Sequence, residues 1–446
     1  MKLRSVVWAA AILSTSVAHA ADAPTPACVA HAAASLDALT HGDYAGARKD
    51  FSAVVAEQVG AARLEQIWKQ LQGMQGAYQS HGTVQRKIFA EQLGAATTLS
   101  FARGKLGFVA TCDAQDKITG YRFVPANLLA SPVEQAHVEA DGVRVSPLNV
   151  PTPVGTLHGA LTLPAGAGPF PAVVMVAGSG PNDMDETIGP NKPLRDIADG
   201  LARVGIATLR YDKRTFDHPN GWGGKSGPDI DAEVTDDAVA AAHLLAQQQA
   251  VDPGRVFVLG HSLGAMMAPR IGQRDPQLAG LVLMAAPARN IFDVLEQQAR
   301  EQMAKEGASP KAIARVEHAY AKERQLLAAA GTGQAVPQGN FRRNPQGYWL
   351  SWSRVDPVAD AKSIAMPILI LQGGSDFQVS PTLDFARWQQ ALAGRPHTTF
   401  HLYPGLSHLF MPAGKTGTPA DYRAPAHVDA RVIDDIAAWV KAQPAR

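Results

Sequence analysis

The chain has 446 residues, of which 46% are hydrophobic and 18% are charged. This composition is ordinary for a folded globular protein, so disorder over most of the chain is excluded, and the length favours two folded units. The 41 Lys and Arg residues almost cancel the 40 Asp and Glu residues. Because no strong net charge exists to attract phosphates, we expect neither nucleic acid nor an acidic lipid surface as a partner.

The first twenty residues have the pattern of a secretory signal peptide. Lys2 and Arg4 precede an apolar stretch over 6–17, and small residues follow up to Ala20. We therefore expect a signal peptide over 1–20, cleavage after Ala20, and a protein that is periplasmic or secreted. The alternative is a retained anchor, but the apolar stretch contains hydroxyl residues and is short for a bilayer. No later segment is long and apolar enough to predict a membrane span.

The only two cysteines, Cys28 and Cys112, both fall in the N-terminal quarter. In an oxidising compartment a lone pair in one small domain most simply forms a disulfide. Closing so long a loop would contribute about 4 to 5 kcal/mol in the chain-entropy model. The alternative is two buried thiols. Neither cysteine lies where catalysis is expected, so a thiol nucleophile or a cysteine-based zinc site is not supported.

The stretch after the signal peptide predicts a small α+β domain over 21–125. Between Ala27 and Gln75, apolar residues recur at three- and four-residue spacings, which is typical of helices. From Thr83 onward they alternate in short runs separated by Gly or Asp, which is typical of strands. Helices followed by such strands indicate an α+β domain. A polar, proline-punctuated stretch over 126–144 then predicts a linker.

From residue 145 to residue 446, short apolar runs alternate with amphipathic segments. The predicted strands are 172–177, 206–211, 256–260, 281–285, 368–372 and 400–403. The predicted helices are 194–204, 234–249, 383–392 and 428–440. This alternation predicts an α/β domain with a mostly parallel sheet covered by helices on both faces.

One interval interrupts this alternation. About eighty residues separate the strands near 285 and 368, and they are too many for a structureless loop. We predict a helical lid insertion over about 288–355. Its aromatic residues either line an apolar acyl or aryl pocket or form the core of the lid; they are Phe341, Tyr348, Trp349 and Trp352.

The strongest local motif is Gly260-His261-Ser262-Leu263-Gly264. A G-x-S-x-G string alone is weak, because it arises by chance roughly once in six or seven chains of this length. Here it follows a predicted buried strand and precedes a helix, which is the context of a nucleophile elbow. In such an elbow the two glycines relieve crowding and the serine is lifted above the sheet edge. The alternative is an ordinary glycine-rich turn between strand and helix.

A serine nucleophile needs an imidazole base, and the base needs a carboxylate. Asp376 follows a predicted strand and is the expected acid, with Asp384 as the second choice and a helix-start charge as the more typical role for Asp384. His408 lies on the loop after the last predicted strand and is the expected base. The other histidines near these segments, His397, His401 and His261, are interpreted as structural.

The tetrahedral intermediate also requires oriented hydrogen-bond donors. We expect one from the backbone N–H of Leu263 and the second from the N–H of Ser179, in the glycine-rich run Gly178-Ser179-Gly180-Pro181 after the strand over 172–177. The alternative for this run is a plain Gly-Pro turn.

At these residues the chain resembles the α/β-hydrolase superfamily, specifically exported bacterial serine hydrolases near the dienelactone hydrolase and prolyl-oligopeptidase-like branches. The similarity runs from about residue 145 to the C-terminus and includes the stretches 178–183, 189–192 and 209–214. It implies an α/β-hydrolase fold with an oxyanion loop over the first of these stretches. Many relatives have His-Gly where this chain has Ala177-Gly178. The region before residue 126 resembles a small domain of unknown function found ahead of such hydrolases.

These features predict a serine hydrolase, most simply a carboxylesterase that acts on a small-molecule ester through an acyl-Ser262 intermediate. A serine peptidase is the nearest alternative, because the same triad serves both reactions. A thioesterase and a ligand-binding protein without catalysis are further alternatives. The sequence has neither an H-E-x-x-H motif, nor a P-loop, nor a dinucleotide fingerprint, so no metal or organic cofactor is expected. The sequence does not indicate an oligomeric state.

Overall fold

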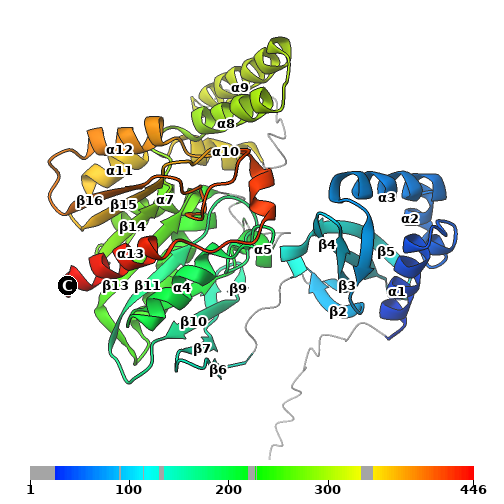
Figure 1. The fold of residues 1–446 in the computed structure, drawn as a ribbon, viewed down its shortest axis with the longest axis horizontal. Coiled ribbons are helices and arrows are strands. Elements are labelled where there is room, and N and C mark those ends of the chain that lie inside the picture. The colour runs from blue at the N-terminus through cyan, green and yellow to red at the C-terminus, as the bar shows by residue number, and fades with distance from the viewer. Residues whose placement is uncertain are drawn as a thin grey trace, which may run out of the picture. The chain divides into compact units, whose positions relative to one another are not determined.

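The computed structural model describes residues 26–89, 92–113, 115–129, 135–218, 223, 227, 229–332 and 345–446 (Figure 1). The predicted signal peptide and Phe341 lie outside the described residues. The chain forms two compact units, a smaller one drawn from the first 122 residues and a larger one that includes everything described from residue 123 onward.

Helices followed by an antiparallel sheet make up the N-terminal region. Its helical elements are α1 (Pro26–Thr40), η1 (Gly46–Arg48), α2 (Ala53–Gln58), α3 (Ala61–Gln75) and η2 (Ala126–Leu129). Its strands are β1 (Tyr78–His81), β2 (Gln85–Phe89), β3 (Gln92–Phe101), β4 (Gly104–Cys112) and β5 (Ile118–Pro125). The sheet has the order β1-β3-β4-β5, and β2 also pairs with β3. The predicted small α+β region is therefore present.

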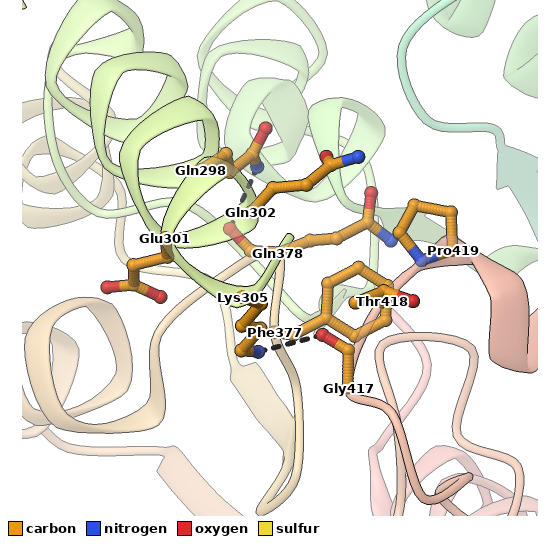
Figure 2. Close-up of a pocket in the computed structure, with 9 residues that line it drawn as sticks. All are labelled: Gln298, Glu301, Gln302, Lys305, Phe377, Gln378, Gly417, Thr418 and Pro419. Carbon is orange, nitrogen blue, oxygen red and sulfur yellow. Dashed lines mark hydrogen bonds between the residues drawn. The ribbon is translucent and has the colours of Figure 1, made fainter. Parts of the chain in front are cut away.

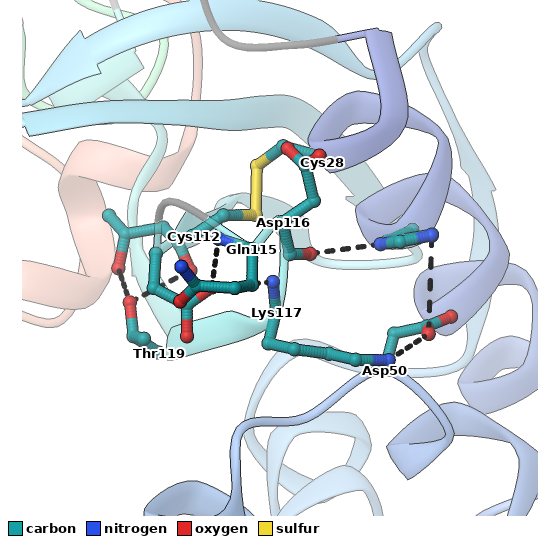
Figure 3. Close-up of a disulfide and its surroundings, with 10 residues drawn as sticks. Cys28, Asp50, Cys112, Gln115, Asp116, Lys117 and Thr119 are labelled. Carbon is teal, nitrogen blue, oxygen red and sulfur yellow. Dashed lines mark hydrogen bonds and ion pairs between the residues drawn. A yellow bond between two sulfur atoms is a disulfide. The ribbon is translucent and has the colours of Figure 1, made fainter.

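A disulfide joins α1 to the end of β4 (Figure 3). It links Cys28 to Cys112 over a sequence separation of 84 residues. Beside it, the Lys117 ammonium donates to Asp50 Oδ1 at 2.9 Å. The structure thus contains the disulfide that the sequence predicts, and this bond ties the first helix of the region to its sheet.

A nine-stranded sheet forms the centre of the larger unit. Its strands are β6 (His137–Val138), β7 (Arg144–Pro147), β10 (Gly159–Leu163), β11 (Phe170–Val176), β12 (Ala207–Tyr211), β13 (Val251–His261), β14 (Gly280–Met284), β15 (Ile368–Gly373) and β16 (Thr398–Tyr403). Their order is β16-β15-β14-β13-β11-β12-β10-β7-β6. The pairs from β12 to β16 are parallel, and β10, β7 and β6 add an antiparallel edge. A separate hairpin joins β8 (Val150–Thr152) and β9 (Gly155–Leu157).

The antiparallel edge begins earlier than the sequence suggests. β6 and Arg144 of β7 lie inside the stretch 126–144 that was interpreted as a linker. Both residues of β6 are exposed, so these short edge strands lack the buried apolar run that makes a strand visible in a sequence.

Alternate residues of the central strands face opposite sides of the sheet. In β11, Val173 and Met175 pack with residues of α4 (Pro193–Arg203) and α13 (Ala430–Ala442). Val174 and Val176 pack instead with residues of α6 (Asp236–Ala246) and α7 (Leu263–Arg274). Both faces are therefore covered, as the uninterrupted apolar strands predict (Figure 1).

Shorter helical segments complete the connections. They are α5 (Arg214–Asp217), η4 (Asp231–Thr235), η5 (Pro381–Phe385), α12 (Ala386–Ala391) and η6 (Pro419–Arg423).

Between β14 and β15 the chain leaves the sheet and forms α8 (Ile291–Lys305), α9 (Pro310–Gly331), α10 (Gln346–Ser353) and α11 (Pro357–Ser363). We call α8 to α10 the helical insertion; it corresponds to the lid predicted over about 288–355, with 333–344 outside the described residues. Its buried side chains, including Phe292 and Tyr348, join the same core as α6 and α7. Over the described part of the chain, none of the helices has the length and hydropathy needed to cross a bilayer.

Candidate active site

Ser262 lies in a tight turn between the end of β13 and the start of α7. Its backbone φ is 52°, which is rare for a residue with a side chain. A Cβ on Gly260 would lie 2.2 Å from the carbonyl carbon of Gly264, and a Cβ on Gly264 would lie 2.2 Å from the carbonyl oxygen of Val176. Only glycine fits at either position, and the Ser262 N–H is fixed by the carbonyl of Met284 at 2.9 Å. The sequence motif therefore folds as a strained strand-turn-helix junction.

His408 and Asp376 meet on the loops that follow β16 and β15. His408 Nδ1 lies 2.8 Å from Asp376 Oδ2, and both side chains are almost fully buried. Asp376 Oδ1 accepts from the backbone N–H groups of Gln378 and Val379 at 2.7 and 2.9 Å. Gln372 Nε2 donates to Asp376 Oδ2 at 2.9 Å. Since the carboxylate occupies Nδ1, that nitrogen carries the proton and Nε2 is left as the basic atom of His408.

His261, the residue before Ser262, contacts His408. The rings of His261 and His408 have their centroids 4.7 Å apart. His261 Nε2 also donates to the backbone carbonyl of His408 at 2.9 Å. The structure thus pairs His408 with Asp376 and, through His261, places His408 beside the turn that carries Ser262, at the carboxyl edge of the parallel strands.

The loop after β11 approaches Ser262. A Cβ on Gly178 would lie 3.2 Å from the Ser262 Cβ. The Gly178 N–H donates to Glu186 Oε1 at 2.8 Å, and the Gly178 carbonyl accepts from Lys213 Nζ at 2.9 Å. The next N–H along the chain belongs to Ser179. Leu263, the other predicted donor, begins α7, where first-turn N–H groups have no acceptor inside the helix.

A buried ion pair between Glu186 and His261 connects this loop to the residue that contacts His408. His261 Nδ1 lies 2.9 Å from both carboxylate oxygens of Glu186, and the two side chains are 4% and 3% exposed. Burial lowers the pKa of His261, but the charge and hydrogen bond of Glu186 outweigh burial and raise it. Glu186 itself has a φ of 52°. Sequence reasoning left His261 as structural and did not identify Glu186.

Further charged and polar side chains stabilise the loop over 178–192. Asp183 accepts from the N–H and hydroxyl of Thr187 at 2.8 and 2.7 Å. Asp185 pairs with Arg210 and, at 2.9 Å, with Lys192. Burial raises the pKa of Asp183 above its usual range. A cluster of acidic residues immediately after a glycine-rich turn was the available sequence signal for this network.

The remaining candidates have other roles. Asp384 is fully buried and binds the Arg289 guanidinium at 2.7 Å, and it also accepts from the Ala288 N–H at 2.9 Å. His401, on β16, binds Asp435 of α13 at 3.0 Å, and His397 is exposed. In this structure the second-choice acid therefore supports the loop after β14 instead of pairing with His408.

The described aromatic residues of the insertion form a core. Tyr348, Trp349 and Trp352 are 3%, 5% and 4% exposed. The two tryptophan rings stack with centroids 5.4 Å apart, and Phe292 contacts Trp349 at 5.6 Å. Of the two alternatives for these residues, the structure favours the core of the insertion over the lining of a pocket.

Two cavities lie beside the loop that carries Asp376. The smaller, about 50 Å³, is enclosed by α8 and the segments 377–378 and 417–419 (Figure 2). Lys305 crosses it to donate to the Gly417 carbonyl at 2.7 Å. The larger, about 340 Å³, is lined by residues that include Ser375 and Ser407, the neighbours of Asp376 and His408. Only the larger cavity has room for a small organic molecule.

Among the described residues, His158, Asp212 and Asp217 bring possible metal ligands within 4.8 Å of one another. His158 Nδ1 and Asp217 Oδ1 already contact each other at 2.9 Å. Burial raises the pKa of Asp212 well above its usual range, and Asp212 Oδ1 already accepts from the Met184 N–H at 2.6 Å. The group is accounted for as an ion pair beside a buried acid.

The fold and this arrangement are those of an α/β hydrolase, and comparison with known proteins agrees. The model of the alpha/beta hydrolase family matches residues 173–416, more than half of the chain, and the chain belongs to this family. It is similar to the esterase EstD of Thermotoga maritima, with 35% identity over 405 residues that cover 90% of this chain and 92% of the esterase.

Solved structures are similar at a greater distance. The esterase domain of a Rhodothermus marinus protein is 16% identical, with 67% of this chain and 98% of that chain covered and a TM-score of 0.41. A dienelactone hydrolase from Anabaena variabilis is 16% identical, with 68% and 99% covered and a TM-score of 0.40.

Proposed function

We propose that the protein is an exported serine carboxylesterase that cleaves small-molecule carboxylic esters through an acyl-Ser262 intermediate. The observation that carries the proposal is a strained serine turn whose preceding residue, His261, contacts His408 of the buried His408–Asp376 pair. The 35% identity to an esterase over 90% of the chain supports ester bonds as the substrate. Export rests on the pattern of residues 1–20, and cleavage after Ala20 would leave Ala21 as the first residue.

In the first half of the reaction, Ser262 Oγ attacks the ester carbonyl carbon and its proton passes to His408 Nε2. The carbonyl π electrons move to oxygen, and the N–H groups of Leu263 and Ser179 bind the resulting oxyanion. The oxyanion collapses, the bond to the alkoxy oxygen breaks, and His408 returns the proton to the leaving alcohol. Asp376 stabilises the imidazolium and keeps Nε2 directed at the reacting atoms.

In the second half, His408 removes a proton from water, and the hydroxide attacks the acyl carbon of the acyl-enzyme. The second tetrahedral intermediate collapses to a carboxylic acid, and Ser262 Oγ recovers its proton from His408. These steps use only the residues of this chain and water.

The decisive experiment is hydrolysis of short and medium p-nitrophenyl esters, with aminoacyl p-nitroanilides assayed in parallel, by protein beginning at Ala21. We expect ester turnover, inert anilides, and a loss of about 10⁴-fold or more in kcat for Ser262→Ala. The matched control is Ser80→Ala, at an exposed strand position, which should retain full activity. Anilide turnover that depends on Ser262 would instead favour a peptidase, and equal labelling of wild type and Ser262→Ala by a fluorophosphonate would contradict a serine nucleophile.

A further inference from the structure

Lys213 is a buried cation that the reaction described above does not use. It follows β12, and its side chain is 4% exposed. The ammonium has two buried partners, the Gly178 carbonyl at 2.9 Å and Glu233 Oε1 at 2.7 Å. The Lys213 backbone N–H also donates to the Asn182 carbonyl at 3.0 Å, so side chain and backbone both contact the loop after β11.

The contact with Gly178 fixes the direction of a neighbouring donor. The peptide group between Gly178 and Ser179 is planar, and in a trans peptide the C=O and N–H bonds point in opposite directions. When Lys213 holds the carbonyl on one side, the Ser179 N–H must point to the other. Asn182 Nδ2 donates to the same carbonyl at 3.1 Å, which further restricts rotation of this peptide.

The positive charge also affects the strength of that donor. A cation on the carbonyl oxygen polarises the peptide, and the N–H becomes a better donor to an anion. This matters most when negative charge develops on the substrate oxygen, because the ground-state ester carries none.

A buried Lys–Glu pair is a poor device for stability alone, since removing both charges from water costs about as much as their attraction returns. Its position against the peptide over Ser262 gives it a specific role. Glu233 compensates the charge of Lys213 while leaving the ammonium free to bind the Gly178 carbonyl.

The same pair continues into the helical insertion. Burial, followed by the charge of the Glu233 carboxylate and a hydrogen bond to it, raises the pKa of Tyr348, on α10. Tyr348 is 3% exposed and packs edge-on against Trp349 and Trp352, which hold it in place. A continuous chain of polar contacts therefore runs from α10 through Glu233 and Lys213 to the peptide of Ser179.

We propose that Lys213 is a positioning residue that orients and polarises the Ser179 N–H for binding the oxyanion, and that Tyr348 of the insertion holds Lys213 in register through Glu233. The proposal rests on the esterase function proposed above. It makes the insertion part of the catalytic support and not only a cover over the sheet.

The test compares Lys213→Met, the charge-neutral double variant Lys213→Met with Glu233→Gln, and Tyr348→Phe. For each folded variant, kcat and KM for p-nitrophenyl butyrate are measured together with the inhibition constant of an alkyl boronic acid, whose tetrahedral adduct mimics the intermediate. We expect the two lysine variants to lose about 10- to 100-fold in kcat with KM changed less than about threefold, and to bind the boronic acid more weakly by the same factor. Tyr348→Phe should lose about three- to tenfold in kcat and in affinity for the boronic acid.

Arg289→Met is the matched control, because it removes another cation from a buried carboxylate, Asp384, and the partners of Arg289 are Asp384 and Gln297. It should lower thermal stability without changing kcat or boronic acid affinity.

If the double variant folds and keeps kcat and boronic acid affinity within about twofold of wild type, the positioning role of Lys213 is wrong. If Tyr348→Phe does so, the supporting role of Tyr348 is wrong. A wild type without Ser262-dependent turnover would overturn both proposals, whereas an active wild type with equally active variants would overturn only the positioning role. Tyr348→Phe removes one oxygen atom and serves as the test if the lysine variants do not fold.

Discussion

The turn after β13 carries Ser262 and the loop after β11 approaches it, yet the two segments are held in place by different forces. Contacts between main-chain atoms fix the turn: Gly260 and Gly264 approach other backbone atoms so closely that no side chain fits. The loop is fixed by buried charges, among them Glu186 and Lys213. Each segment carries one residue with a φ of 52°, Ser262 and Glu186.

This difference determines what can be recognised in a sequence. Steric fixation needs glycines at set positions within five residues, so it leaves a short motif. Electrostatic fixation draws on partners far apart in the chain: His261 is 75 residues from Glu186, and Lys213 is 35 residues from Gly178. A buried charge network therefore leaves at most a local excess of charged residues in the sequence, and its pairs are identified only once the fold brings the partners together.

The largest expected effect comes from adding a side chain in the turn after β13, which is fixed by close main-chain contacts. Gly264→Ala would place a Cβ 2.2 Å from the Val176 carbonyl oxygen, and only backbone movement can relieve the contact. We expect a loss of about 10³-fold or more in ester turnover and a destabilisation of about 3 kcal/mol, at the upper end for overpacking. Turnover and urea unfolding measure these effects. Gly347→Ala, in α10 with open space around its Cα, is the control and should change stability by less than about 1 kcal/mol.

Removing Glu186 tests whether buried charges hold the loop after β11. Glu186→Ala deletes the acceptors of the Gly178 N–H and of His261, and we expect kcat to fall about 10²-fold. Glu186→Gln can still accept from Gly178 and donate to neutral His261, so its loss should be about tenfold or less. The comparison of kcat for the two variants separates the hydrogen bonds from the charge. Equal activity of Glu186→Ala and wild type would show that the loop is held without this residue.

The pH dependence of stability tests the ion pair between Glu186 and His261. The pKa of His261 is lowered by burial but raised more by Glu186, so it lies above the unfolded value of about 6.5. The stability from this ionisation is fully present below the unfolded pKa and is lost as the pH rises through the folded pKa. We expect the difference in unfolding free energy between wild type and Glu186→Gln to shrink from about pH 6.5 upward. The exposed Glu306→Gln variant should show no such change, and a constant difference for Glu186→Gln would argue against the ion pair.

The smallest effect on turnover is expected from the N-terminal region. Replacing Cys28 and Cys112 by serine removes a cross-link over 84 residues. This should destabilise that region by about 2 to 4 kcal/mol, the typical range for protein disulfides, which lies below the chain-entropy value of about 4 to 5 kcal/mol. Ester turnover should stay within about twofold, because every residue assigned to catalysis lies between 178 and 408. Thermal unfolding with and without reductant measures the first effect, and the double serine variant should be insensitive to reductant. A large loss of turnover would reveal a catalytic contribution from this region.

The sequence was most informative where a local pattern and a local force coincide. Apolar runs such as 256–260 and 368–372 predicted the parallel strands, and the spacing of glycines around Ser262 predicted the turn. The order of motifs along the chain then placed Asp376 and His408 on neighbouring loops, where the structure joins them at 2.8 Å.

Other features could not be predicted because their partners are distant or their signals are weak. Nothing around His261 indicates that it binds both Glu186 and the backbone of His408. The short strand β6 has exposed residues and no apolar run, so it was included in a linker. Nothing near Asp384 in the sequence indicates that its partner is the guanidinium of Arg289, 95 residues earlier.

The contact between His261 and the carbonyl of His408 has a consequence for protein engineering. The second letter of a G-x-S-x-G motif is unspecified by the motif, which makes it a natural position to randomise. In this protein the residue at that letter, His261, holds the main chain of His408 and pairs with a carboxylate 75 residues upstream. A library at position 261 should therefore be built together with position 186, since productive replacements are expected as pairs.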